Sequence, residues 1–253
     1  SSISAMFSGV MTAISFYIIM RFTVTLYGGA KLTGSIGNAT YVMLMIVGVI
    51  SMIIGSLLTL VQEDLKRLLA FSTVANAGYV MFGIGLLAFE RWPLSPDHLM
   101  PLQASVLHLV NHTIVKVLLF LCAGAILFVT GQKRIDELGG LGKKMPFLAF
   151  CYSIGALAIV GVPLLNCFVS KWFLIVAAIA KASAVYYISA IVIVATSAIM
   201  LGAQLRVIYA MTAGVPRAEM KAIKLPLTMT VPMAVLTFLT IVLGVYPQLI
   251  LPY

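Results

Sequence analysis

Apolar residues run along almost the whole chain in long, nearly unbroken stretches. A helix needs about 20 consecutive apolar residues to cross the hydrocarbon core of a bilayer, so each stretch of that length predicts a transmembrane helix. Six are expected, at Ser4–Tyr27, Ile36–Val61, Leu68–Phe89, Gln103–Thr130, Ala184–Met211 and Leu227–Leu249. The pattern predicts an all-α, polytopic bundle of membrane helices.

A further apolar region, Met145–Lys181, is interrupted by Gly161, Val162 and Pro163. As one helix it would reach roughly 55 Å, too long for one straight crossing of a core about 30 Å thick. It is expected to form either two helices or one discontinuous helix near Gly161–Pro163. The bundle then holds about seven to eight transmembrane helices.

The connections between these segments are short. The longest are Glu90–Pro101, Gly131–Lys144 and Thr212–Lys224, about a dozen residues each. We therefore expect residues 1–253 to form a single transmembrane domain. The chain begins inside an apolar pattern, with no Met and no basic n-region of a signal peptide. We interpret this start as that of a processed or split protein, or of part of a longer one.

Up to the Gly161–Pro163 interruption, the basic residues of the connections gather on one side of the expected bundle. That side holds Lys66, Arg67, Lys133, Arg134, Lys143 and Lys144, and the opposite side holds Lys31 and Arg91. Because basic loops are retained in the cytoplasm, the first side is expected to be cytoplasmic.

Composition excludes a soluble globular fold. Hydrophobic residues make up 62% of the 253 residues and charged residues 9%, against roughly 45–50% and 25% in soluble domains. The 16 Lys and Arg outnumber the 7 Asp and Glu, which gives a net charge of +9. These basic residues are spread thinly between apolar runs, which disfavours a nucleic-acid partner.

The sequence also gives no support for a cofactor. Cys122, Cys151 and Cys167 lie inside apolar stretches, without a C-x-x-C or a Cys/His group at metal-ligand spacing. There is no G-x-G-x-x-G, no P-loop and no nucleophile motif. We expect no cofactor and no metal in this chain.

One expected helix, Gln103–Thr130, carries four polar residues, His108, Asn111, His112 and Lys116. Spacings of three and four residues place them on one stripe of the helix. Successive titratable groups rise by about 6 Å, near enough to pass a proton directly or through one water. We interpret the stripe as a proton relay. The alternative is that the histidines bond neighbouring helices and that Lys116 pairs with a carboxylate.

Lys171 lies eight residues after Pro163, with apolar sequence on both sides. A Gly/Pro interruption frees backbone carbonyls at membrane depth, which is tolerated where they line a hydrated cavity. Gly161 and Pro163 therefore predict a broken helix, and Lys171 a gating or terminal proton site. The alternative is a lysine that snorkels to the interface. Snorkelling also accounts for Arg21, Arg91, Lys181 and Arg206.

The run Gln62–Arg67 is a compact charged turn between two expected helices. Glu63 or Asp64 is expected either to pair with Lys66 or Arg67, or to lie at the start of the following helix, where the helix dipole favours acidic groups.

Four motifs, in this order, resemble signatures of antiporter-like subunits, which occur in respiratory complex I, multisubunit sodium/proton antiporters and membrane-bound hydrogenases. They are Gln62-Glu-Asp-Leu-Lys-Arg-Leu-Leu-Ala-Phe-Ser, His108-x-x-Asn-His112-x-x-x-Lys116-x-Leu-Leu-Phe-Leu-x-Ala-Gly, Gly139-Gly-Leu-Gly-Lys-Lys-Met-Pro and Gly161-Val-Pro-x5-Val-Ser-Lys171. Ser4-Ala-Met-Phe-Ser-Gly resembles the start of the family's earlier broken helix. The resemblance covers the whole chain, but about the C-terminal half of a usual family member.

The resemblance implies a half-channel in which protons pass along the His/His/Lys helix to a lysine at a helix break. The matching residues are His108, His112, Lys116 and Lys171, with Asn111, Lys66, Asp64, Gly161 and Pro163 in supporting positions. It further implies other membrane subunits, the lipid bilayer and protons as partners, with sodium left open. The host membrane would be the cell membrane or the mitochondrial inner membrane.

The chain also departs from the family pattern. Ala13 stands where the family commonly has a lysine, and no Lys, His, Asp or Glu occurs between Lys31 and Glu63. Ser72-Thr-Val-Ala-Asn76 stands where Ser-Ser-x-Ser-His is frequent. These departures imply that the family's first half-channel is absent or inert here.

Our main hypothesis is a proton-translocating component of a respiratory-type or antiporter complex, in which other subunits carry the driving or redox chemistry. Protons would run through His108, His112 and Lys116 to Lys171, or the reverse. A second hypothesis is a structural role, in which the chain seals a partner channel and has no complete path of its own. A stand-alone solute transporter is disfavoured, because half a repeat pair lacks the half against which it would rock.

Overall fold

The computed structural model describes residues 2–28, 35–88, 99–214 and 225–249. Helices fill these ranges, which hold no β-strand beyond an isolated bridge between Asp64 and Arg134. The longer elements are α2 (Thr12–Gly28), α3 (Ser35–Val61), α4 (Leu65–Gly85), α5 (Met100–Thr130), α7 (Pro146–Val160), α8 (Asn166–Ile179), α9 (Ala184–Ala213) and α10 (Leu227–Val245). The shorter ones are α1 (Ser2–Ala5), the π-helical η1 (Met6–Met11), η3 (Ile135–Glu137), α6 (Leu141–Lys144) and η4 (Pro247–Leu249).

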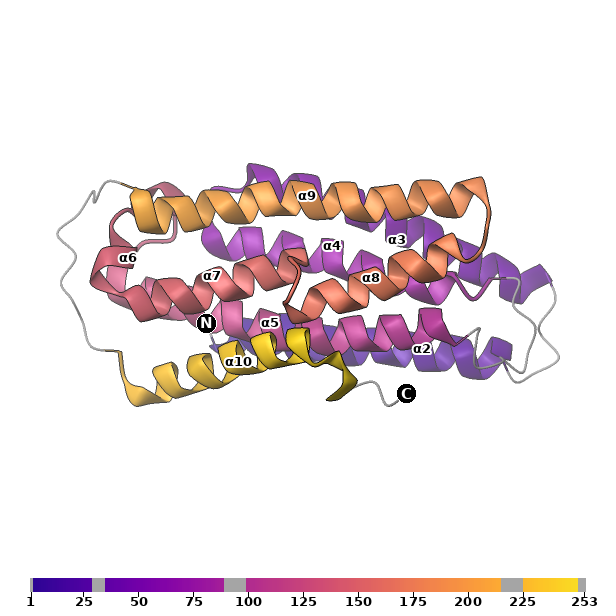
Figure 1. The fold of residues 1–253 in the computed structure, drawn as a ribbon, viewed down its shortest axis with the longest axis horizontal. Helices are drawn as coiled ribbons and strands as arrows, with labels where there is room; N and C mark the ends of the chain where they lie inside the picture. Colours follow the sequence, from indigo (N-terminus) through magenta and orange to yellow (C-terminus); the bar gives the residue numbers. More distant parts are fainter. Residues whose placement is uncertain (1, 29–34, 89–98, 215–224, 250–253) are drawn as a thin grey trace.

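The described helices lie along the long axis of the molecule, as Figure 1 shows. Six of them are long and apolar enough to cross a membrane, which confirms the six expected spans. The boundaries differ by a few residues. For example, α4 begins at Leu65 rather than Leu68, because the carboxylate of Asp64 caps its first turn.

The Met145–Lys181 region forms one discontinuous crossing. Its two halves, α7 and α8, have 15 and 14 residues, so each spans only about 20 Å and is too short to cross alone. They follow one another along the long axis, with the break near the middle of the bundle (Figure 1). The described helices therefore make six complete crossings and this broken one.

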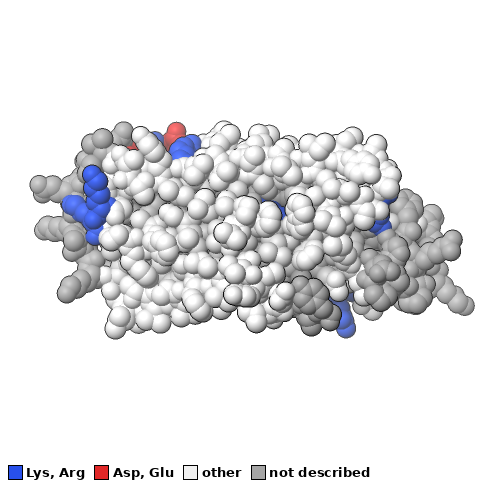
Figure 2. All heavy atoms as spheres, in the orientation of Figure 1, with Lys and Arg blue, Asp and Glu red and all other residues white. Residues whose placement is uncertain are grey.

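The surface fits a lipid environment. Figure 2 shows Lys and Arg near the ends of the long axis and an almost uncharged band between them. Large apolar side chains are exposed along the outer helices, among them Ile46 and Ile50 of α3, Ile191 of α9 and Phe238 of α10. The chain is a multi-pass integral membrane protein, as the composition predicted.

Helix α5 lies in the interior of the bundle, where it contacts α4, α7, α8 and α10. Most of its length is buried. Val106 and Val110 lie on an exposed stripe of α5, and polar residues on the opposite, buried side meet other helices rather than lipid.

Helix α4 is held against α3 through glycines that let the two backbones touch. A Cβ atom added to Gly78 would lie 2.6 Å from the carbonyl oxygen of Gly48 and 2.8 Å from the backbone nitrogen of Met52. Small residues at such positions allow the close packing that holds membrane helices together. The α3–α4 pair therefore fixes the face that α4 turns toward α5.

We expect Gly78→Ala to destabilise the protein by about 1–3 kcal/mol, because backbone atoms of α3 would have to move. Gly202→Ala in α9 is the matched control, since its Cβ would meet only Leu60, at 3.8 Å. Thermal unfolding of both variants in nanodiscs checks the prediction. An unfolding temperature for Gly78→Ala equal to that of the control would contradict it.

Candidate functional site

The polar stripe of α5 faces the interior of the bundle. His108, Asn111, His112 and Lys116 are each at most 3% exposed. The helical spacing predicted a common face for these four residues, and the structure places them on the buried side. Charged or titratable groups so far from water require polar partners, which come from α4 and α8.

Lys116 reaches across to α4. Its ammonium donates to the backbone carbonyl of Leu69 and, at 2.8 Å, to the hydroxyl of Ser72. Its Nζ also lies 5.9 Å from the ring centre of Phe120, one turn further along α5. In the part of the chain that the structure describes, no carboxylate pairs with Lys116. The alternative of a Lys116–carboxylate pair therefore finds no support among these residues.

The two histidines lie one above the other. Their ring centres are 6.4 Å apart, and Nδ1 of His108 lies 2.8 Å from the hydroxyl of Ser170 in α8. Nε2 of His108 and Nε2 of His112 are both buried without a hydrogen-bond partner. Each histidine therefore keeps one ring nitrogen able to take or give a proton.

Two asparagines join α5 to the start of α8. Nδ2 of Asn111 donates to the backbone carbonyl of Asn166 at 2.8 Å, and Nδ2 of Asn166 donates to that of Asn111 at 3.4 Å. Because α8 runs antiparallel to α5, Ser170 then meets His108. The lysine that follows Ser170 is thus next to the His108 end of the stripe, and Lys116 lies at the other end.

This arrangement changes the expected order of the groups. The sequence suggested that Lys116 hands the proton to Lys171. The antiparallel run of α8 instead gives the order Lys116, His112, His108, Lys171.

Lys171 is buried at the helix break and does not snorkel to the interface, since it is only 4% exposed. Its Nζ donates to the carbonyl of Val160 at 2.7 Å and to that of Ile159 at 3.4 Å. In a continuous helix these carbonyls would accept from the N–H groups of residues 164 and 163.

The break removes both of those donors. Pro163 has no N–H, and the chain turns away at Gly161 (φ +91°) and Leu164 (φ +72°) before residue 164 can complete the ladder. Lys171 therefore caps the end of α7, where cations are favoured by the helix dipole.

Tyr79 of α4 completes the surroundings of Lys171. Nζ of Lys171 lies 4.4 Å from the centre of the tyrosine ring, and the His108 ring meets the same ring edge-on, with the centres 5.4 Å apart. Nζ also donates to the hydroxyl of Ser197 in α9 at 3.1 Å. The sequence interpretation missed Tyr79, Ser170 and Ser197, because hydroxyl residues in apolar helices carry no periodic signal of their own.

Buried polar atoms without a hydrogen-bond partner gather on the faces of α4, α5 and α8 that line this site. Six buried side-chain nitrogen or oxygen atoms of the described residues have no hydrogen-bond partner. Five of them belong to Asn76, His108, Asn111, His112 and Asn166, and the sixth belongs to Gln204 of α9. Buried polar atoms are normally satisfied, so such a concentration calls for an explanation.

The charged turn Gln62–Arg67 lies at one end of the bundle, away from this site. Asp64 accepts from the backbone N–H groups of Lys66 and Arg67, so it caps α4 as one of the two alternatives predicted. Glu63 pairs with Arg134 at 2.8 Å, not with Lys66 or Arg67.

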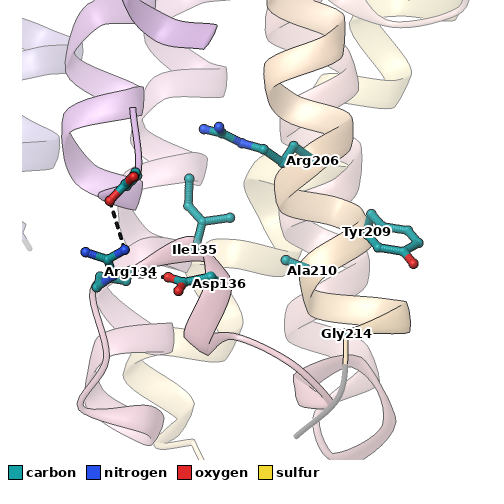
Figure 3. A pocket seen from close by; sticks show the side chains of 8 residues that line it. Arg134, Ile135, Asp136, Arg206, Tyr209, Ala210 and Gly214 are labelled. Carbon is teal, nitrogen blue, oxygen red and sulfur yellow. Dashed lines mark hydrogen bonds and ion pairs between the residues drawn. The ribbon is translucent and has the colours of Figure 1, made fainter. Parts of the chain in front are cut away.

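The Glu63–Arg134 pairing follows from the backbone. The N–H of Ile135 donates to the carbonyl of Glu63, and the N–H of Leu65 donates to that of Lys133. Asp136 and Glu63 raise the pKa of Arg134, which stays charged. These residues border a surface cavity of about 520 Å³, with Arg206 and Tyr209 on its α9 side (Figure 3).

A family model described as "NADH:quinone oxidoreductase/Mrp antiporter, TM" matches residues 1–201, which include all of the stripe, the break and Lys171. The chain belongs to this family. Its members are transmembrane proteins, in agreement with the six long apolar helices.

Relatives of this family come from several complexes. Hydrogenase-4 component B of Escherichia coli is 37% identical over 175 residues, 68% of this chain and 25% of that protein. A Na(+)/H(+) antiporter protein of Alkalihalophilus pseudofirmus is 30% identical over 254 residues, all of this chain and 48% of that protein. The chain thus spans a quarter to a half of the lengths of these family members.

The fold is shared with a solved family structure. In the membrane-bound sulfane sulfur reductase, an archaeal respiratory membrane complex, a chain superposes with a TM-score of 0.82 at 26% identity. The match covers 97% of this chain and 46% of that one.

We expect Gly161→Ala to lower stability by more than the backbone strain alone, which is about 1–2 kcal/mol for an alanine at positive φ. The added Cβ would also lie 3.0 Å from Cδ of Lys171. Gly131→Ala is the control, since Gly131 has φ +69° and nothing within 4 Å of its Cβ position. Equal decreases in the unfolding temperature of the two variants would show that contact with Lys171 adds nothing to the backbone strain at Gly161.

Proposed function

We propose that this chain supplies a proton half-channel to a larger membrane complex, along Lys116, His112, His108 and Lys171. The observation that supports this most strongly is the burial of four titratable groups in one row, each within reach of a polar neighbour. A bilayer protein bears the cost of burying such groups where they carry ions or protons. The family membership supports a role in proton or cation translocation.

The chemistry of the row favours protons over sodium. Sodium ions are held by oxygen ligands and are repelled by ammonium groups, whereas Lys and His bind and release protons. None of the buried charged residues in the described ranges is Asp or Glu. Sodium exchange, the activity named for the relative from Alkalihalophilus pseudofirmus, would on this proposal need groups outside this row.

Water bridges the larger gaps in this proposal. Buried nitrogen and oxygen atoms without partners are the positions at which ordered water is bound inside proteins. His112 Nε2 and Asn76 Oδ1 are of this kind. His112 lies on α5 between Lys116 and His108, and Asn76 lies on α4 between Ser72, which bonds Lys116, and Tyr79, which contacts Lys171. A proton leaving Lys116 would reach His112 and then His108 through such waters.

Phe120 lies between Lys116 and a surface cavity. A surface cavity of about 560 Å³ is bordered by Lys66, Thr73 and Phe120, and the ring of Phe120 lies 5.9 Å from Nζ of Lys116. We propose that protons exchange with Lys116 on this side. Like-charge repulsion would then make a proton on one group of the row disfavour a proton on the next, which drives transfer along it.

The second function considered, a sealing role without a path of its own, draws on the departures near the start of the chain. Ala13 packs against an apolar cluster formed by residues such as Met20 and Leu109, so the position where relatives of the family commonly have a lysine is apolar. This supports the loss of a first half-channel, and it leaves the row from Lys116 to Lys171 intact.

We expect Lys116→Met to abolish proton translocation by the complex that contains this chain. Met keeps much of the side-chain volume, and the Leu69 carbonyl still accepts from the hydroxyl of Ser72, so folding and assembly should survive. The measurement is proton uptake into proteoliposomes, normalised to the amount of assembled complex. Arg21→Gln, at an exposed position on α2, is the control and should translocate normally.

Unchanged translocation by Lys116→Met would contradict the half-channel and favour the sealing role. Loss of assembly in Lys116→Met would be separated from loss of transport by the composition of the variant complex on a native gel.

A further inference from the structure

The surroundings of Lys171 contain a chain of three hydroxyl groups that the proton row does not use. The hydroxyl of Tyr79 lies 3.2 Å from that of Ser197 and 2.9 Å from that of Thr196. Ser197 also accepts from Nζ of Lys171. Tyr79 and Thr196 are at most 2% exposed, so the chain runs from a buried ammonium group into α9.

The direction of each hydrogen bond follows from counting hydrogens. Thr196 has one hydroxyl hydrogen. The backbone carbonyl of Val192, 2.7 Å away, is a nearer acceptor for it than that of Ile193, at 3.1 Å. With the Thr196 hydrogen on the Val192 carbonyl, its shortest contact, the tyrosine donates to Thr196. Its only hydrogen is then used, so Ser197 donates to the oxygen of Tyr79.

As an ammonium group, Lys171 finds an acceptor for each of its hydrogens at the start of this chain. Its three hydrogens meet three acceptors, the carbonyls of Ile159 and Val160 and the hydroxyl oxygen of Ser197. The ring face of Tyr79 adds a fourth electron-rich group, which attracts a cation.

A neutral amine has a lone pair and needs a donor. Among the groups that contact Nζ, the carbonyls and the ring cannot donate, and the hydroxyl of Ser197 can. When the proton leaves Lys171, the hydrogen of Ser197 is therefore drawn away from Tyr79 and toward Nζ.

We propose that Tyr79 is a positioning residue for Lys171. Its ring and the hydroxyl chain through Ser197 and Thr196 hold the ammonium at the end of α7, and the Ser197 hydrogen bond switches from Tyr79 to Lys171 when the proton leaves. The proposal rests on the proton half-channel described above. It ties the charge of Lys171 to α4 and α9, the two helices that carry the hydroxyl groups.

Two substitutions separate the ring from the hydroxyl. Tyr79→Phe keeps the ring face and removes one hydrogen-bonded hydroxyl, which should slow proton translocation about fivefold. Tyr79→Leu removes the ring as well, which should slow it more than tenfold. Faster proton translocation by Tyr79→Phe than by Tyr79→Leu shows that the ring acts on Lys171, since both variants lose the hydroxyl.

Infrared difference spectroscopy with ring-labelled tyrosine gives a readout that a purely structural role would not move. An imposed pH gradient across proteoliposomes that hold the complex should change the phenol band of one tyrosine. The band should vanish in Tyr79→Phe, Ser197→Ala and Lys171→Met. It should persist in Tyr152→Phe, which removes another buried tyrosine hydroxyl, one bonded to Gln204.

The outcomes distinguish the two proposals. A gradient-sensitive band that survives in Tyr79→Phe or Ser197→Ala would overturn the role of Tyr79, even if Lys171→Met stops translocation. Normal translocation by Lys171→Met would overturn the half-channel itself.

Discussion

A lysine ammonium at membrane depth must be surrounded by acceptors, and the structure meets this requirement by breaking a helix. Lys171 donates to carbonyls of Ile159 and Val160 that lost their helical donors when Pro163 and Gly161 ended α7. The break and the lysine thus depend on each other. Without the break Lys171 would lose its two carbonyl acceptors and keep only the hydroxyl of Ser197. Without Lys171 the end of α7 would be left unsatisfied inside the bundle.

The neighbouring helices arrange the other groups around this pair. The antiparallel contact between α5 and α8, fixed by Asn111 and Asn166, sets His108 beside Ser170 and leaves Lys116 two turns away. Close backbone contact of α3 and α4 through Gly48 and Gly78 holds α4 in place. The same face of α4 then offers Ser72 to Lys116 and Tyr79 to Lys171. These helix contacts hold the row of polar side chains in position in the low-dielectric interior of the bundle.

Much of this architecture was predictable, because the bilayer imposes a simple length rule. The six long spans, the break at Gly161–Pro163 and the common face of His108, His112 and Lys116 follow from apolar run length and helical spacing. The order of the groups was not, since it depends on which residues of α5 and α8 meet. Tyr79 and Ser197 were also missed, because they come from separate helices and their relation to Lys171 exists only in three dimensions. The pairing of Glu63 with Arg134, rather than with a neighbour in sequence, was missed because it too exists only in the folded structure.

On the function proposed above, the buried row from Lys116 to Lys171 is a hydrated path for protons. A map of the assembled complex at a resolution that shows ordered water tests it most directly. A hydrated path requires water bonded to Nε2 of His112 and to Oδ1 of Asn76, joining the Lys116 end of the row to His108. A dry, closely packed apolar contact around these two atoms would contradict it.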